Sequence, residues 1–194
     1  MSESSLWLVK KDFSGEEAFE YPNSWLVAPV VFNAMIKKYT GSDMDFIIAF
    51  GSDESFFKNL NHSLNRSENQ VDRVLWELVN QQGFYSKDKL FVADCIRSFF
   101  KGNAEYIGKD SYDILERFLQ LAEEIESIDE EENTLFIFKN TSVDDGVVSL
   151  FQRYNEEEEK YVSCKLTDNP DKLFGTSIIE DNQIVGFRRI SDMV

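Results

Sequence analysis

Apolar residues change their spacing about two-thirds of the way along the chain. In the first part they recur every three or four residues, which is the spacing of one face of an α-helix. The first such stripe covers residues 28–39, with Pro29 in its first turn and Gly41 placed to end it. From Thr134 onward apolar and polar residues alternate, as in β-strands. The order of the two patterns predicts an α+β fold, with a helical N-terminal two-thirds packed against a C-terminal antiparallel β-meander.

Four further stripes predict helices in the middle of the chain. They span residues 56–64, 71–79, 91–99 and 115–125. Ser52 is placed to cap the first of them, and Asp110 the last. The tetrapeptide Ser-Glu-Asn-Gln at 67–70 has the spacing of a capping box and should open the second.

Short apolar runs with turn residues between them predict the strands. Residues 5–10 indicate an edge strand that can join the C-terminal sheet, 12–23 a polar connector, and 45–50 a buried strand. The predicted meander consists of runs at 134–138, 147–151, 161–165, 177–179 and 184–187.

The domain organisation follows from these elements. We expect a single α+β domain over residues 1–194, with a mainly helical part (1–128) and an antiparallel sheet (133–194) as the alternative subdivision. The acidic stretch at 123–132 is either a linker between these parts or the solvated end of the last helix.

Charge excludes several classes of function. The 194 residues include 36 acidic and 20 basic side chains, which gives a formal net charge of −16. Direct binding of nucleic acid or of an anionic membrane requires clustered Lys and Arg, so neither is expected. The sequence has no run long enough to span a bilayer, no signal-peptide pattern and no disulfide framework, since Cys95 and Cys164 are its two cysteines. We therefore expect a cytoplasmic protein.

Motifs for catalysis and cofactor binding are missing from the sequence. A catalytic system built on histidine would have to use His62, which lies on a predicted helix and is expected at its surface. One His and two separated Cys lack the paired spacing of a zinc site, and no glycine-rich phosphate loop is present. The sequence predicts no catalytic residues, no metal site and no cofactor, and hence a protein that is not an enzyme.

Acidic clusters are the most prominent feature that remains. They are Asp129, Glu130, Glu131 and Glu132; Asp144 and Asp145; and Glu156, Glu157, Glu158 and Glu159. Turns of a meander alternate between its two ends, so we expect the first and third clusters to share one end and to reinforce one negative field. Such a field steers a cationic partner into encounter. Tyr154 and Tyr161 flank the third cluster and are candidate anchors, with packing on the sheet face as the equal alternative.

In size, acidity, lack of a catalytic constellation and acidic turns at 129–132 and 156–159, the chain resembles the small acidic immunity proteins of bacterial toxin–immunity systems, including contact-dependent growth inhibition. The resemblance implies a role rather than a fold: tight binding of a cognate basic toxin, which covers its active site or an adjacent surface. A nuclease is the expected toxin, because an enzyme that binds phosphate is basic on its substrate face.

Two other functions remain open at this point. An acidic mimic of nucleic acid, or an adaptor, would bind several basic proteins with steep salt dependence. An enzyme that uses carboxylates would need a cleft that holds two carboxyl groups with mutually shifted pKa values.

Overall fold

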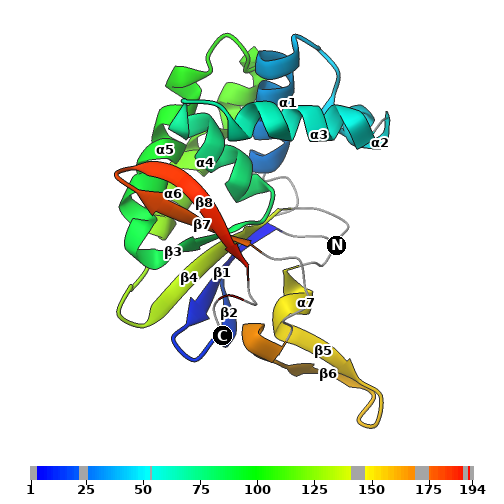
Figure 1. Cartoon of the computed structure of the whole chain (residues 1–194), viewed down its shortest axis with the longest axis vertical. Coiled ribbons are helices and arrows are strands. Elements are labelled where there is room, and N and C mark those ends of the chain that lie inside the picture. The colour runs from blue at the N-terminus through cyan, green and yellow to red at the C-terminus, as the bar shows by residue number, and fades with distance from the viewer. Residues whose placement is uncertain are drawn as a thin grey trace.

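A six-stranded β-sheet runs through the middle of the molecule, and a layer of helices covers one of its faces (Figure 1). The computed structural model describes residues 4–21, 26–52, 54–140, 147–168, 175–189 and 192. The strands lie in the order β2–β1–β4–β3–β7–β8, and neighbours are antiparallel except β3 and β7, which are parallel. They are β1 (Ser4–Lys10), β2 (Gly15–Tyr21), β3 (Gly83–Tyr85), β4 (Asn133–Lys139), β7 (Gly175–Glu180) and β8 (Gln183–Arg189).

The helical layer is arranged around α4, which contacts α1, α3 and α5 as well as strands β4 and β8. The helices are α1 (Val27–Thr40), α2 (Phe46–Ser52), α3 (Glu54–Asn65), α4 (Gln70–Val79), α5 (Lys89–Gly102), α6 (Leu115–Glu126) and α7 (Val148–Phe151), with 3-10 turns η1 (Ser86–Asp88), η2 (Lys109–Ile114) and η3 (Leu166–Asp168). In the described part of the chain, none of the helices has the length and apolar character needed to cross a membrane.

Alternation along β4 divides the core between the two faces of the sheet. Phe136 and Phe138 belong to the large cluster under the helices, whereas Leu135 and Ile137 belong to a smaller cluster on the opposite face, with Trp7. Successive side chains of a strand point to opposite faces, so one strand serves both clusters. The smaller cluster also includes Phe151, which lies directly before strand β5 (Gln152–Asn155).

The α+β class predicted from the sequence is confirmed, and so are the main helical stripes. The stripe at 28–39 forms α1, and Gly41 ends it in the left-handed region with φ of 70°. The stripes at 71–79, 91–99 and 115–125 lie within or along α4, α5 and α6. The first strand joins the C-terminal sheet as expected, because β1 pairs with β4.

Three predictions for the N-terminal region are wrong. Strand β1 is not at an edge, because it lies between β2 and β4. The predicted connector at 12–23 contains the true edge strand, β2. The predicted strand at 45–50 is helix α2, whose first amides are bound by side chains: Asp45 Oδ1 accepts from the Ile47 N–H (2.9 Å) and Asn33 Oδ1 from the Phe46 N–H (2.8 Å).

The predicted strands at 134–138, 177–179 and 184–187 are confirmed within β4, β7 and β8, but their predicted arrangement as a meander is wrong. Residues 148–151 form helix α7 rather than a strand. Strand β4 pairs with β1 and β3, and the β7–β8 hairpin joins the sheet through β3. The strand predicted at 161–165 belongs to a separate two-stranded sheet.

Two predicted helix caps are wrong as well. Asn69, not Ser67, caps α4, with its side chain accepting from the Asp72 N–H (3.3 Å). Helix α6 begins after Ile114 rather than at Asp110, because residues 109–114 form η2. The side chain of Ser52 lies outside the described residues.

Candidate partner-binding site

Strands β5 (Gln152–Asn155) and β6 (Lys160–Ser163) form a hairpin that projects from the body of the molecule (Figure 1). Six of its eight strand residues are exposed, and Asn155 and Val162 are half-buried. A two-stranded hairpin is at best marginally stable by itself in water. This one must therefore be held at its root.

Phe151, the residue before β5, supplies the root. Its ring stacks on Trp7 with centroids 5.3 Å apart and an interplanar angle of 9°. The ring also lies against Gly15, where an added Cβ would stand 2.3 Å from the nearest ring carbon. The backbone N–H of Cys164 donates to the Phe151 carbonyl (2.8 Å), which continues the ladder of the hairpin into the body. The projecting part is thus fixed at its base by aromatic packing in the smaller core cluster.

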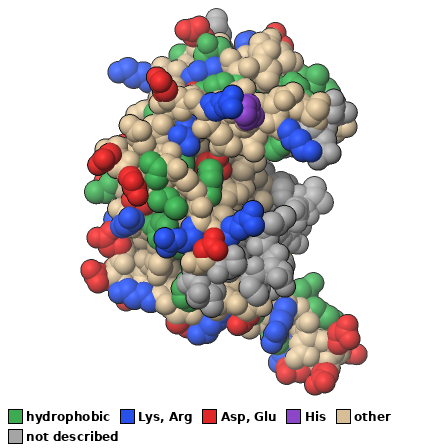
Figure 2. All heavy atoms as spheres, viewed as in Figure 1, with side chains coloured by type: hydrophobic (Ala, Val, Ile, Leu, Met, Phe, Trp, Pro, Cys, Tyr) green, Lys and Arg blue, Asp and Glu red, His purple; other side chains and the backbone are tan. Residues whose placement is uncertain are grey.

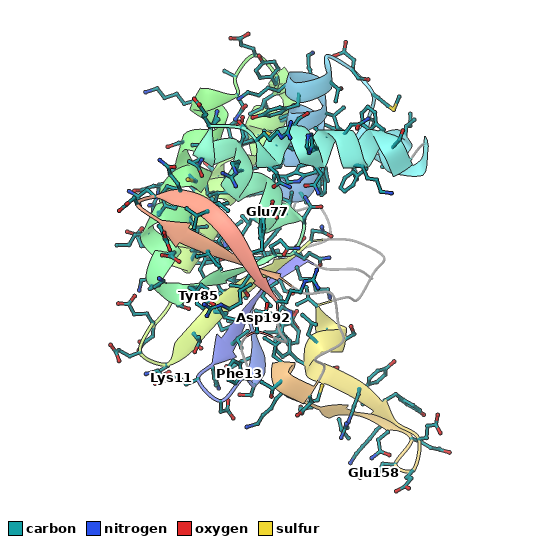
Figure 3. All side chains as sticks on the ribbon, in the orientation of Figure 1. Lys11, Phe13, Glu77, Tyr85, Glu158 and Asp192 are labelled. Atoms are coloured by element: carbon teal, nitrogen blue, oxygen red, sulfur yellow. The ribbon has the colours of Figure 1, made fainter. Side chains whose placement is uncertain are left out.

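The turn of the hairpin carries the third acidic cluster. Glu156, Glu157, Glu158 and Glu159 are all exposed there, and the label of Glu158 in Figure 3 marks the far end of the hairpin. Asn155 shapes the turn, since its Oδ1 accepts from the N–H groups of Glu157 (3.0 Å) and Glu158 (3.3 Å). One carboxylate is locally balanced, because Glu158 lies 2.7 Å from Lys160 Nζ.

Tyr154 and Tyr161 stand directly opposite each other, next to the acidic turn. Their ring centroids are 5.4 Å apart at an interplanar angle of 68°, an edge-to-face arrangement. Tyr154 and Tyr161 are 52% and 69% exposed, so neither residue is buried by packing on a sheet face. The structure brings these two tyrosines and the third acidic cluster together on one element.

The first acidic cluster lies elsewhere, which overturns the prediction of a shared end. Asp129, Glu130, Glu131 and Glu132 form the connection between α6 and β4, so the acidic stretch is a helix end and a turn. Glu131 lies 3.8 Å from Lys11 Nζ. Lys11 and Glu158 are labelled at well-separated places in Figure 3, one beside the sheet and the other at the end of the hairpin. The predicted pair of Asp144 and Asp145 lies outside the described residues.

Asp72 is a buried carboxylate in the helical layer, and both of its oxygens have partners. It is therefore not free to act as a catalytic group. Asp72, whose side chain has no solvent exposure, lies 2.6 Å from Lys38 Nζ. Its oxygens also accept from Tyr39 Oη (2.7 Å) and Asn103 Nδ2 (3.0 Å). Lys38 Nζ donates in addition to Asn103 Oδ1 (2.8 Å). This network joins α1, α4 and the end of α5, and it stabilises the fold.

Other candidates for chemistry are equally unpromising within the described residues. Burial raises the pKa of Glu77 to about 7, but no second carboxyl contributes to that shift. His62 is exposed, both cysteines are buried thiols outside any disulfide, and no group of three or more potential metal ligands occurs in the described part.

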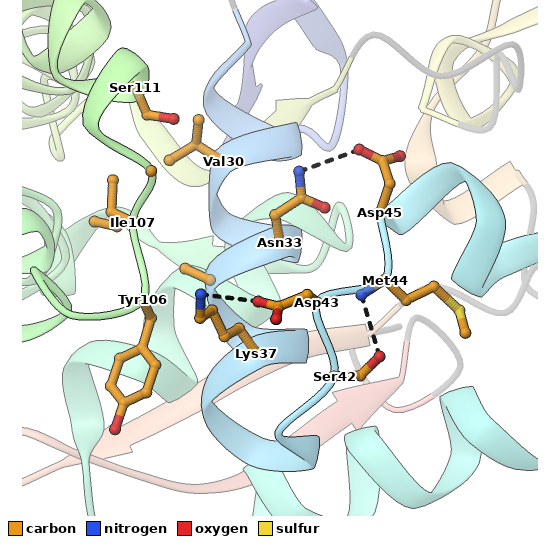
Figure 4. A pocket seen from close by; sticks show the side chains of 12 residues that line it. Val30, Asn33, Lys37, Ser42, Asp43, Met44, Asp45, Tyr106, Ile107 and Ser111 are labelled. Atoms are coloured by element: carbon orange, nitrogen blue, oxygen red, sulfur yellow. Dashed lines mark hydrogen bonds and ion pairs between the residues drawn. The ribbon is translucent and has the colours of Figure 1, made fainter.

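A polar cavity of about 250 Å³ lies between α1 and the segments 42–45 and 106–111 (Figure 4). Its charged side chains have partners: Lys37 Nζ is 2.8 Å from Asp43 Oδ1, and Asp45 Oδ2 accepts a hydrogen bond from Asn33 Nδ2 (3.5 Å). The charged groups that line this cavity are therefore held by neighbouring side chains.

Comparison with known proteins adds no family: no protein-family model, curated protein or solved structure matches the chain. The hairpin is thus the best candidate site on its own geometry. Sequence reasoning found its tyrosines and its acidic turn, but missed its root, because residues 147–151 read as a strand of the main sheet. The close approach of Phe151 to Gly15 could not be inferred from either residue's neighbours in sequence.

Proposed function

We propose that this chain is a non-enzymatic binding protein of the cytoplasm, an immunity-type inhibitor that neutralises a basic toxin with a nuclease domain. The observation that supports the proposal best is the hairpin arm, defined as residues 152–163. It carries four glutamates at its end and an exposed tyrosine pair beside them, on a base held by Phe151.

The placement of the glutamates favours capture of a cationic protein. Charges at the end of a projecting element reach a partner before the body does, and complementary fields raise association rates by about 10- to 1,000-fold. The chain keeps a net charge of −16 despite the self-repulsion that this charge causes. An inhibitor that must reach a toxin before the toxin reaches nucleic acid gains from fast association.

Exposed tyrosines beside the charge favour a specific complex over a loose one. Tyr and Trp are enriched among the residues that contribute most to interface affinity, because a large rigid ring buries much area at little entropic cost. Tyr154 and Tyr161 already contact each other, so less side-chain freedom is lost when a partner covers them. The acidic turn would then control the rate of encounter, and the rings the lifetime of the complex.

The test uses the toxin encoded by the reading frame directly upstream, where an immunity gene's partner is expected. The activity of the purified toxin domain is measured while this protein is titrated into it. The proposal predicts complete inhibition at about one inhibitor per toxin, retained at high salt. Binding of several unrelated basic proteins that is lost at high salt would instead favour a nucleic-acid mimic.

Two triple variants with the same change in net charge provide the matched comparison. One carries Glu156→Lys, Glu157→Lys and Glu159→Lys on the arm; the other carries Glu130→Lys, Glu131→Lys and Glu132→Lys before β4. We expect the arm variant to require a large excess for inhibition and the second variant to inhibit like the wild type. Equal loss in both variants would mean that overall charge, and not the arm, governs binding.

A further inference from the structure

The two faces of the hairpin arm differ in chemistry, because its register sorts the side chains. Tyr154 lies opposite Tyr161, and Gln152 opposite Ser163, so these four uncharged residues share one face. The intervening positions form the other face and include both cationic residues of the strands. These positions are Arg153, Asn155, Lys160 and Val162.

Figure 2 shows this division on the surface of the arm: Lys and Arg side chains lie along one side, and the acidic side chains gather at its end. A basic partner drawn to the acidic turn meets like charge if it settles against Arg153, since Lys160 is paired with Glu158. The tyrosine face offers no such repulsion. Charge complementarity therefore selects the face as well as the end of the arm.

Backbone geometry holds the two rings in place on that face. The hydrogen bond from the Cys164 N–H to the Phe151 carbonyl marks a hydrogen-bonded pair. Pairs alternate along an antiparallel ladder, so the Tyr154–Tyr161 pair, three steps further on, is non-hydrogen-bonded. Side chains lie closer together at such pairs, which agrees with the 5.4 Å between the ring centroids. The ring pair is thus formed before any partner arrives.

A flat cation is the group that this surface suits best. Aromatic faces attract cations, and the guanidinium of arginine, which is planar and weakly hydrated, stacks on them more readily than the ammonium of lysine. We infer that the Tyr154–Tyr161 face of the hairpin arm, and not its Arg153 face, seats an arginine side chain of the basic partner. This inference rests on the proposed function, which supplies a cationic partner.

Hexa-arginine and hexa-lysine peptides test the preference by calorimetry at about 0.15 M salt, where long-range attraction is already screened beyond about 8 Å. The wild type should bind hexa-arginine more tightly than hexa-lysine. Tyr154→Leu with Tyr161→Leu should reduce that ratio of affinities by about 2- to 5-fold, the range expected for an exposed cation–π contact. Tyr154→Phe with Tyr161→Phe keeps the rings and should keep the ratio, and Arg153→Ala on the other face should leave it unchanged.

A measurement on the wild type avoids any effect of the substitutions on folding. With ¹³C-labelled tyrosine, hexa-arginine should shift the ring signals of Tyr154 and Tyr161 more than those of the other five tyrosines. An unchanged ratio in the leucine variant, a ratio lowered by Arg153→Ala, or larger shifts at other tyrosines would each overturn the inference. None of these results bears on toxin inhibition by the wild type, so the proposed function is judged separately by the toxin titration.

Discussion

Replacement of Glu77 by glutamine should make the protein more stable at neutral and alkaline pH. Glu77 lies on α4, the helix at the centre of the helical layer, and is 7% exposed. Burial disfavours the charged carboxylate and raises the pKa of Glu77 to about 7, although the charge of Arg73 partly offsets this effect. Glutamine has nearly the same shape and cannot ionise.

The size of the effect follows from the difference in pKa between the folded and unfolded states. The ordinary pKa of the carboxyl is 4.5, and each unit above it corresponds to about 1.4 kcal/mol, so the folded state loses about 3 kcal/mol when Glu77 is ionised. The folded state binds the proton more tightly than the unfolded chain. The contribution of protonated Glu77 to the free energy of unfolding is therefore fully present below pH 4.5. It is lost as the pH rises through about 7 and remains lost at higher pH.

Urea denaturation of wild type and Glu77→Gln at several pH values between 4.5 and 8.5 measures this directly. The free energy of unfolding of the variant, relative to the wild type, should rise across the series and level off about 3 kcal/mol higher. Glu123→Gln, on the exposed side of α6, is the control and should produce no such rise. A difference between Glu77→Gln and wild type that does not change with pH would refute the reasoning.

Three other predictions concern the buried network, the root of the arm and a thiol. Asp72→Ala should lower the free energy of unfolding by about 3–5 kcal/mol in urea titrations, because Lys38 loses its buried counter-charge. Gly15→Ala should cost about 1–3 kcal/mol and alter the near-ultraviolet circular dichroism of the aromatic root, because the new Cβ collides with Phe151. Cys95 should react with a thiol reagent at pH 8 only as fast as the protein opens, since burial raises its pKa to about 12; rapid labelling of the native protein would contradict this.

Local pattern was enough to predict elements whose side chains follow one period over several turns. Helix α1 is 14 residues long, follows the apolar stripe at 28–39 and ends at a glycine in the left-handed region, so both its existence and its end could be predicted. Short apolar runs were not enough. Residues 45–50 were predicted as a buried strand, but Ile47 and Ile48 are 70% and 61% exposed on α2. Helix and strand cannot be distinguished over five apolar residues.

Edge strand β2 was missed because its pattern is that of a solvated strand. Glu16, Glu17 and Glu20 are exposed on it, and exposed charges on an edge strand discourage pairing with other chains. The order of the strands in the sheet could not be predicted from the sequence either. The parallel pairing of β3 with β7 joins residues more than ninety positions apart, and the local pattern of apolar and polar residues carries no information about such contacts.

The candidate site was predicted in its parts but not as a unit. The acidic run and its flanking tyrosines are visible in the sequence, and the turn forms at the acidic run as predicted, with Asn155 Oδ1 accepting from the Glu157 N–H. Their projection from the body depends on Phe151, which packs against Trp7 and Gly15 from a distant part of the chain. For the same reason the first acidic cluster could not be excluded before the positions of α6 and β4 were known.

The association rate constant between this protein and its toxin tests the central claim most directly. It is measured by stopped-flow at several salt concentrations for the wild type and for the two triple lysine variants, which change net charge equally. We predict that reversal at Glu156, Glu157 and Glu159 slows association at low salt by about 10-fold or more and flattens its salt dependence, whereas reversal at Glu130, Glu131 and Glu132 has a much smaller effect. Equal rates for the two variants would contradict the role assigned to the arm.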